Sequence, residues 1–160
     1  MSKKNTVLHE EQQAKLIELL NRRLADAIDL QLQSRQACWN VKGPHFMALR
    51  ELFDQVAQGV EEDANLMAAR IVQLGGMAEG TAQAVARRTA LDAYWLATAD
   101  GNGHIDALSK TLTDFGRHVR YASEQATELK DADTAAIFTE IARGIDKWLW
   151  FVETSQQSGN

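Results

Sequence analysis

Apolar residues recur at helical spacing over the first quarter of the chain. Between about His9 and Trp39 they are three or four positions apart, which is the spacing that lines up one face of an α-helix. The pattern therefore predicts a long first helix. Its expected core face consists of Leu16, Leu20, Leu24, Ile28 and Leu32, widened by Ile17 and Leu30.

Turn-forming residues then interrupt the pattern. Gly43-Pro44 ends the first helix, because proline cannot continue it. A second helix is predicted from about Phe46 to Leu74, and Gly75-Gly76 follows it in the manner of a helix C-terminus. The apolar positions that define this helix are Leu49, Phe53, Val56, Val60, Met67, Ile71 and Leu74.

The second half of the chain contains two more periodic stretches after a long connection. Residues 79–103 are irregular and are expected to form a crossover, with a short helix in it. A third helix follows around Ile105–Val119, and Asp131 or Asp133 is expected to cap a fourth. Four helices with a long connection between the second and third predict an all-α four-helix bundle. The expected organisation is a tail at residues 1–8, one bundle domain at 9–154 and a loose tail at 155–160.

Composition narrows the class of protein further. The 160 residues include one cysteine, so no internal disulfide framework is possible. The chain contains neither an apolar run long enough for a membrane span nor an apolar leader segment, so a cytoplasmic location is expected. The net charge of −5 argues against a strongly basic nucleic-acid surface.

Several sequence blocks, correctly ordered and spaced, resemble those of the Dps miniferritins, a family of the ferritin-like superfamily. The blocks are residues 37–46 (ACWNVKGPHF), 48–54 (ALRELFD), 70–76 (RIVQLGG), 133–135 (DTA) and 146–153 (DKWLWFVE). The resemblance implies a ferritin-like bundle that assembles into a hollow shell of twelve identical subunits. It also implies a bacterial cytoplasmic protein, in some cases associated with the nucleoid. Such shells oxidise ferrous iron, usually with peroxide, store ferric mineral, and often bind DNA.

The resemblance also locates the residues expected to bind iron. The family uses two histidines and an aspartate from one subunit, with an aspartate and a glutamate from its two-fold neighbour. Here these positions hold, in chain order, Cys38, Arg50, Asp54, Asn65 and Ala69. Only Asp54 keeps the expected type, and an arginine brings a permanent positive charge to a cation site.

Two interpretations of these positions follow. In the first, Arg50 lies one helical turn before Asp54 and forms an ion pair with it, replacing the metal. In the second, a shifted metal site uses Asp54 with Cys38 or with Glu61, which shares its helix face. The first predicts that ferroxidase activity is lost or strongly reduced, and the second that it is retained.

The resemblance also implies acidic pores for iron and a surface that binds DNA. In the family's shells the three-fold pores are lined by acidic residues near the start of the fourth helix, where this chain has Asp131, Asp133, Glu140 and Asp146. Non-specific DNA binding would use Lys3 and Lys4, although two lysines bind DNA weakly. The expected function is a Dps-like cage that sequesters iron and protects DNA against oxidative or starvation stress. The alternatives are a non-enzymatic DNA-binding or scaffold shell, and an active ferroxidase with a shifted site.

Overall fold

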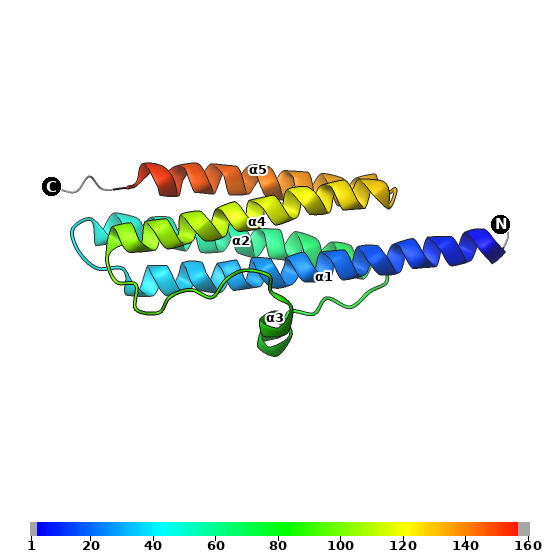
Figure 1. Cartoon of the computed structure of the whole chain (residues 1–160), viewed down its shortest axis with the longest axis horizontal. Helices are drawn as coiled ribbons and strands as arrows, with labels where there is room; N and C mark the ends of the chain where they lie inside the picture. Colours follow the sequence, from blue (N-terminus) through cyan, green and yellow to red (C-terminus); the bar gives the residue numbers. More distant parts are fainter. Residues whose placement is uncertain (1–2, 157–160) are drawn as a thin grey trace.

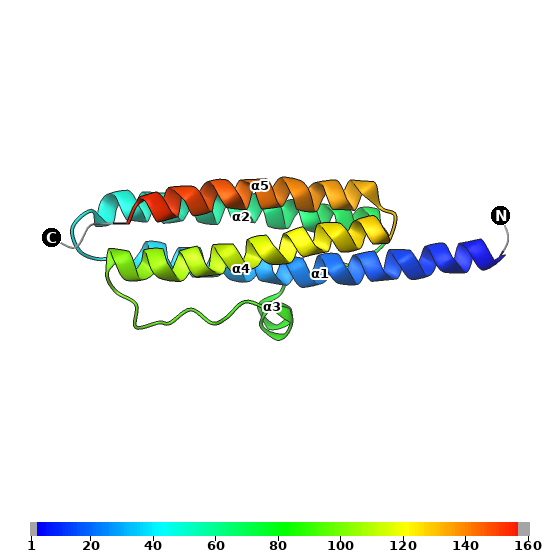
Figure 2. The same ribbon diagram turned by 45° about the horizontal axis from the view of Figure 1, so that its top comes forward.

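Four long helices lie side by side in the computed structural model, which describes the backbone of residues 3–156 and side chains from residue 9 (Figures 1 and 2). They are α1 (Lys3–Asn40), α2 (Phe46–Gln73), α4 (Gly101–Glu128) and α5 (Ala132–Thr154), with a short α3 (Ala82–Arg88) in the crossover. The predicted all-α bundle with a helix-bearing crossover is therefore confirmed. No described helix combines the length and apolar character needed to cross a membrane.

Local signals explain where three of the helices begin or end. Gly75 adopts a left-handed conformation after α2, and the Gly76 N–H donates to the Ile71 carbonyl at 2.9 Å. Asp100 caps α4 by accepting from the Gly103 N–H at 2.7 Å. Asp131, rather than Asp133, caps α5. These helix ends lie close to the positions that the sequence predicts.

The core face of α1 differs from the predicted stripe. Leu16, Leu20 and Leu24 are buried as expected, but Leu32 is 53% exposed and Ile28 is only partly buried. A step of four residues turns a helix by about 40° more than a full circle, so a strict four-residue repeat drifts out of the core. Steps of three residues between apolar positions compensate for this drift. The core face of α1 therefore also includes the buried Ala27, Leu30, Ala37 and Cys38.

Helical structure extends into the segment predicted as the N-terminal tail. α1 begins at Lys3 and extends beyond the other helices in Figures 1 and 2, so the backbone of residues 3–8 is helical. Ser155 ends α5 as its C-cap residue. Residues 157–160 of the predicted C-terminal tail lie outside the described part of the chain.

Buried polar side chains attach the crossover to the bundle. The Ala90 N–H donates to the carboxylate of Asp26, a fully buried residue of α1, at 2.8 Å. His118 of α4 lies 3.2 Å from the other oxygen of this carboxylate. Further along, Tyr94 is hydrogen-bonded to the buried His104 of α4 and stacks on its ring. These contacts fix the crossover along the side of α1 (Figures 1 and 2).

Candidate functional site

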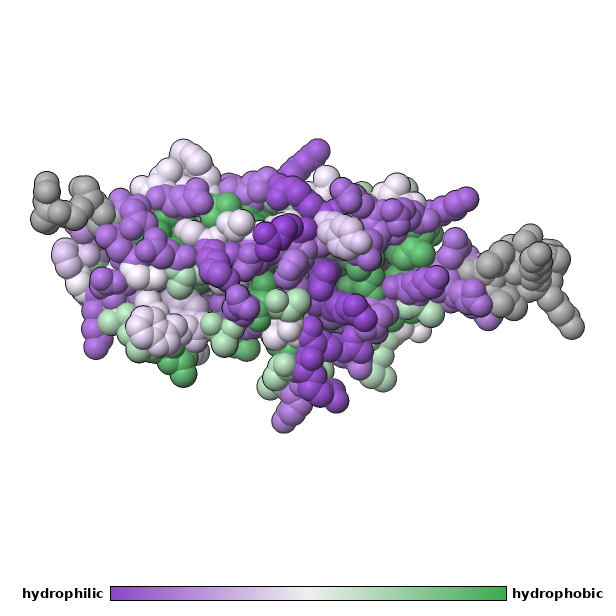
Figure 3. All heavy atoms as spheres, in the orientation of Figure 1, coloured by the Kyte–Doolittle hydropathy of each residue, from purple (hydrophilic) through white to green (hydrophobic). Residues whose placement is uncertain are grey.

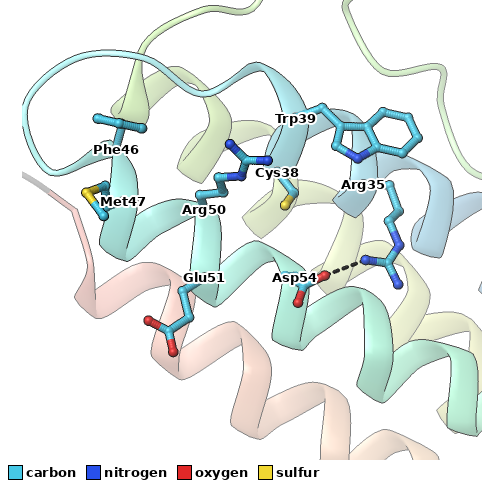
Figure 4. Close-up of a pocket in the computed structure, with 8 residues that line it drawn as sticks. All are labelled: Arg35, Cys38, Trp39, Phe46, Met47, Arg50, Glu51 and Asp54. Atoms are coloured by element: carbon cyan, nitrogen blue, oxygen red, sulfur yellow. Dashed lines mark hydrogen bonds and ion pairs between the residues drawn. The ribbon is translucent and has the colours of Figure 1, made fainter.

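The carboxylate of Asp54 is occupied on both oxygens by side chains of its own subunit. Arg35, on α1, donates to Oδ1 through Nη1 and forms an ion pair (Figure 4). Gln58, one turn further along α2, donates to Oδ2 at 2.8 Å. The one expected iron ligand that this sequence retains is therefore neutralised by a cation from the neighbouring helix.

The predicted pairing of Arg50 with Asp54 is wrong. Among the described residues, Arg50 makes neither a hydrogen bond nor an ion pair, and its guanidinium points towards the Cys38 end of α1 (Figure 4). Helical side chains lean towards the N-terminus of their helix, so Arg50 leans away from Asp54. An ion pair one helical turn apart is also more favourable when the acidic residue precedes the basic one, whereas here Arg50 precedes Asp54.

These residues surround a pocket of about 500 Å³ between the last turns of α1 and the first turns of α2. Cys38 is buried at 7% exposure, whereas Trp39 is 66% exposed. The pocket therefore combines two guanidinium groups, two carboxylates, a thiol and an apolar rim. Its lining consists of Arg35, Cys38, Trp39, Phe46, Met47, Arg50, Glu51 and Asp54 (Figure 4).

The other expected metal positions do not converge on this pocket within one subunit. Asn65 and Ala69 are exposed on α2, about 16 and 22 Å along its axis from Asp54 at the usual helical rise. Glu61 is also exposed and lies about 10 Å along the axis from Asp54, so a shifted site that uses both carboxylates stays a prediction. The described residues contain no group of three His, Cys, Asp or Glu side chains arranged to hold a metal.

Two of the four expected pore residues are engaged in ion pairs. Asp131 pairs with Arg70 of α2 at 2.9 Å, and Asp146 pairs with Arg120 of α4. The pKa of Asp131 is below its usual value. Burial alone would raise this pKa, but the hydrogen bonds from the Thr134 N–H and from Arg70 stabilise the carboxylate and have the larger combined effect. The remaining two, Asp133 and Glu140, are exposed and form no ion pair within the described part of the chain.

One unusual carboxyl group was not predicted from the sequence. Asp63 is half-buried on α2, and burial, followed by repulsion from Glu62 and Glu140, raises its pKa to about 7. Lys147 of α5 acts in the opposite direction. A carboxyl group of this kind is partly protonated near neutral pH.

Lys3 and Lys4 belong to the first turn of α1, but their side chains lie outside the described part of the structure. DNA binding through them remains a prediction.

Arg35 and Gln58 are the contacts of Asp54 that the sequence did not predict. Gln58 carries a local signal, because it lies one turn after Asp54 and can reach it along the helix. Arg35 carries none, because its contact with Asp54 depends on how α1 and α2 are aligned side by side.

Comparison with known proteins identifies the family. The Ferritin-like domain model matches residues 17–158. The DNA protection during starvation protein of Agrobacterium fabrum is 41% identical over 142 residues, covering 89% of this chain and 88% of the relative. Among solved structures, DpsA14 from Streptomyces coelicolor has a TM-score of 0.87 at 34% identity, and the match covers 93% of this chain and 88% of the DpsA14 chain. Mycobacterium smegmatis Dps also has a TM-score of 0.87, at 26% identity, covering 93% and 90% of the two chains. The chain therefore belongs to the Dps miniferritin family of ferritin-like proteins.

Proposed function

We propose that this protein is the subunit of a Dps-type cage that sequesters iron and protects DNA without a ferroxidase centre of the usual form. The observation that carries the proposal is the occupation of Asp54 by Arg35 and Gln58. Iron that bound this carboxylate would have to displace an ion pair and a hydrogen bond. It would also lie close to the guanidinium of Arg50, which repels cations.

The remaining family positions support the same conclusion. Iron sites of this type need carboxylates to balance the charge of the metal. Asn65 offers a neutral oxygen and Ala69 offers no donor atom, so a neighbouring subunit would add no charge at these positions. Cys38 could bind as a thiolate, but a thiolate exposed to ferrous iron and peroxide is readily oxidised.

Self-association of the subunit, as a shell of twelve requires, is supported by the large apolar side chains on its surface. Single exposed apolar residues are ordinary, but this bundle has many large ones, and several surround the pocket and the end of α5. Hydrophobic and hydrophilic side chains are interspersed on the face shown in Figure 3. The exposed set consists of Leu32, Trp39, Phe46, Met47, Leu66, Val72, Met77, Trp95, Leu96, Tyr121, Trp150 and Phe151.

In such a shell, iron would enter through acidic pores and DNA would bind only on the outside. Asp133 and Glu140 supply unpaired carboxylates that would attract cations by electrostatic focusing. Lys3 and Lys4, repeated in twelve copies, would give weak and non-specific DNA binding. A gel shift at low salt that disappears at moderate salt is the expected result.

A crystal soak tests the absence of a metal centre. Crystals of the assembled protein are soaked in ferrous or zinc salt, and anomalous density is sought around Cys38 and Asp54 across the two-fold contact. We expect no metal on the Asp54 carboxylate and an intact Arg35–Asp54 pair. A metal ion coordinated by Asp54 and shared with the neighbouring subunit would contradict the proposal.

A further inference from the structure

The pocket between α1 and α2 contains one guanidinium group that is unpaired among the described residues of a single subunit. Arg35 is neutralised by Asp54, but Arg50 makes no hydrogen bond or ion pair with any residue that the structure describes. The nearest acid in sequence is Glu51, whose carboxylate points away from the Arg50 guanidinium in Figure 4. The Arg50 side of the pocket therefore carries an unbalanced positive charge.

The shape and lining of the pocket suit an anion. The side chains of Arg50 and Arg35 enter the pocket from opposite sides (Figure 4). Arg35 donates to Asp54 through Nη1 alone, so both guanidinium groups have N–H donors left for a ligand. The exposed apolar side chains of Trp39, Phe46 and Met47 form the rim, and of the two carboxylates in the lining, Asp54 is already paired with Arg35. A volume of about 500 Å³ is in the range of small-ligand sites.

We infer that this pocket binds a phosphate-type oxyanion at the place where iron would be held in the family's usual site. Two N–H groups of a guanidinium match two oxygens of a phosphate, which gives a directional and charge-assisted contact. The inference rests on the proposed function, because an anion and a ferrous ion would not share this pocket. It extends that function by assigning a ligand to the pocket.

Calorimetric titration of the assembled full-length protein with inorganic phosphate, at constant ionic strength, tests the inference. We expect saturable binding of one phosphate per subunit, weakened at least tenfold by Arg50→Gln. The matched control is Arg87→Gln, which removes an exposed arginine of α3 that also has no described partner. This control should bind phosphate like the wild type. Circular dichroism and gel filtration verify that both variants fold and assemble.

Three results would overturn the inference: no saturable binding by the wild type, equal binding by Arg50→Gln, or equal weakening by Arg87→Gln. A parallel titration with adenosine 5′-monophosphate distinguishes free phosphate from phosphate attached to an aromatic base that stacks on Trp39. The metal soak separates this inference from the proposed function. If only the inference fails, phosphate does not bind and Asp54 stays free of metal, whereas metal on Asp54 means that the proposed function itself has failed.

Discussion

At the residue scale, the pairing of Asp54 with Arg35 rather than Arg50 is open to direct measurement. In a double-mutant cycle, Arg35→Gln and Asp54→Asn are expected to show a coupling free energy of about 0.5–1 kcal/mol, because the pair is only partly exposed and Arg35 is held across two helices. The matched cycle with Arg50→Gln should show a coupling near zero. Urea unfolding of each variant gives these values, and the reverse ranking would restore the pairing predicted from the sequence.

Asp63 gives a prediction for the dependence of stability on pH. Its folded pKa, about 7, is above its unfolded value, so the folded protein binds this proton more tightly and loses stability as the pH rises from about 4 to about 7. Asp63→Asn removes this loss of stability and should increase the free energy of unfolding at pH 8, by at most about 4 kcal/mol, since each pKa unit corresponds to about 1.4 kcal/mol. Little change is expected at pH 4. Glu61→Gln, at an exposed position of the same helix, is the control. An equal gain for both variants would show that the effect comes from overall charge.

The candidate site was partly predictable at this scale. The sequence identified Asp54 and the unsuitable residues around it, because those depend only on residue type and order. It gave the wrong partner, because a contact within one helix can be read from spacing whereas the contact between Arg35 and Asp54 depends on helix packing. The raised pKa of Asp63 has the same origin, since Glu140 and Lys147 reach it from α5.

At the scale of the elements, the contact between α2 and α5 depends on a glycine. A Cβ atom at Gly59 would lie 2.5–2.8 Å from the indole of Trp148, so α5 rests directly on the backbone of α2. Gly59→Ala should therefore destabilise the protein by about 1–3 kcal/mol, although alanine is the better helix former. At Gly144 a Cβ atom would meet nothing within 4 Å, and Gly144→Ala should stabilise by up to about 1 kcal/mol. Thermal unfolding compares the two, and stabilisation by both would show that Trp148 does not pack against α2.

The helix boundaries were more predictable than the helix faces. Gly75, Asp100 and Asp131 act through their own backbone conformation or side chain, so their positions alone indicate where helices end or begin. Which side of α1 faces the core depends on the accumulated rotation over the whole helix. That rotation is why Leu32 is exposed although it continues the apolar repeat.

At the scale of the whole molecule, the bundle has the family fold, and we propose that the chemistry of one pocket has changed. The four long helices superimpose well on known Dps structures, with TM-scores of 0.87 for two of them. The core that supports this fold is separate from the charged residues around Asp54, so those residues can change without loss of the bundle. A cage that stores iron without oxidising it rapidly is the consequence that we propose.

Stopped-flow oxidation of ferrous iron by peroxide, with the assembled protein, tests this account most directly. A ferritin with a working ferroxidase centre serves as the positive control, and buffer alone as the baseline. Because Arg35 and Gln58 occupy Asp54, we predict no fast saturable phase and a rate close to that of buffer. A fast phase that saturates at a fixed number of iron ions per subunit would contradict it.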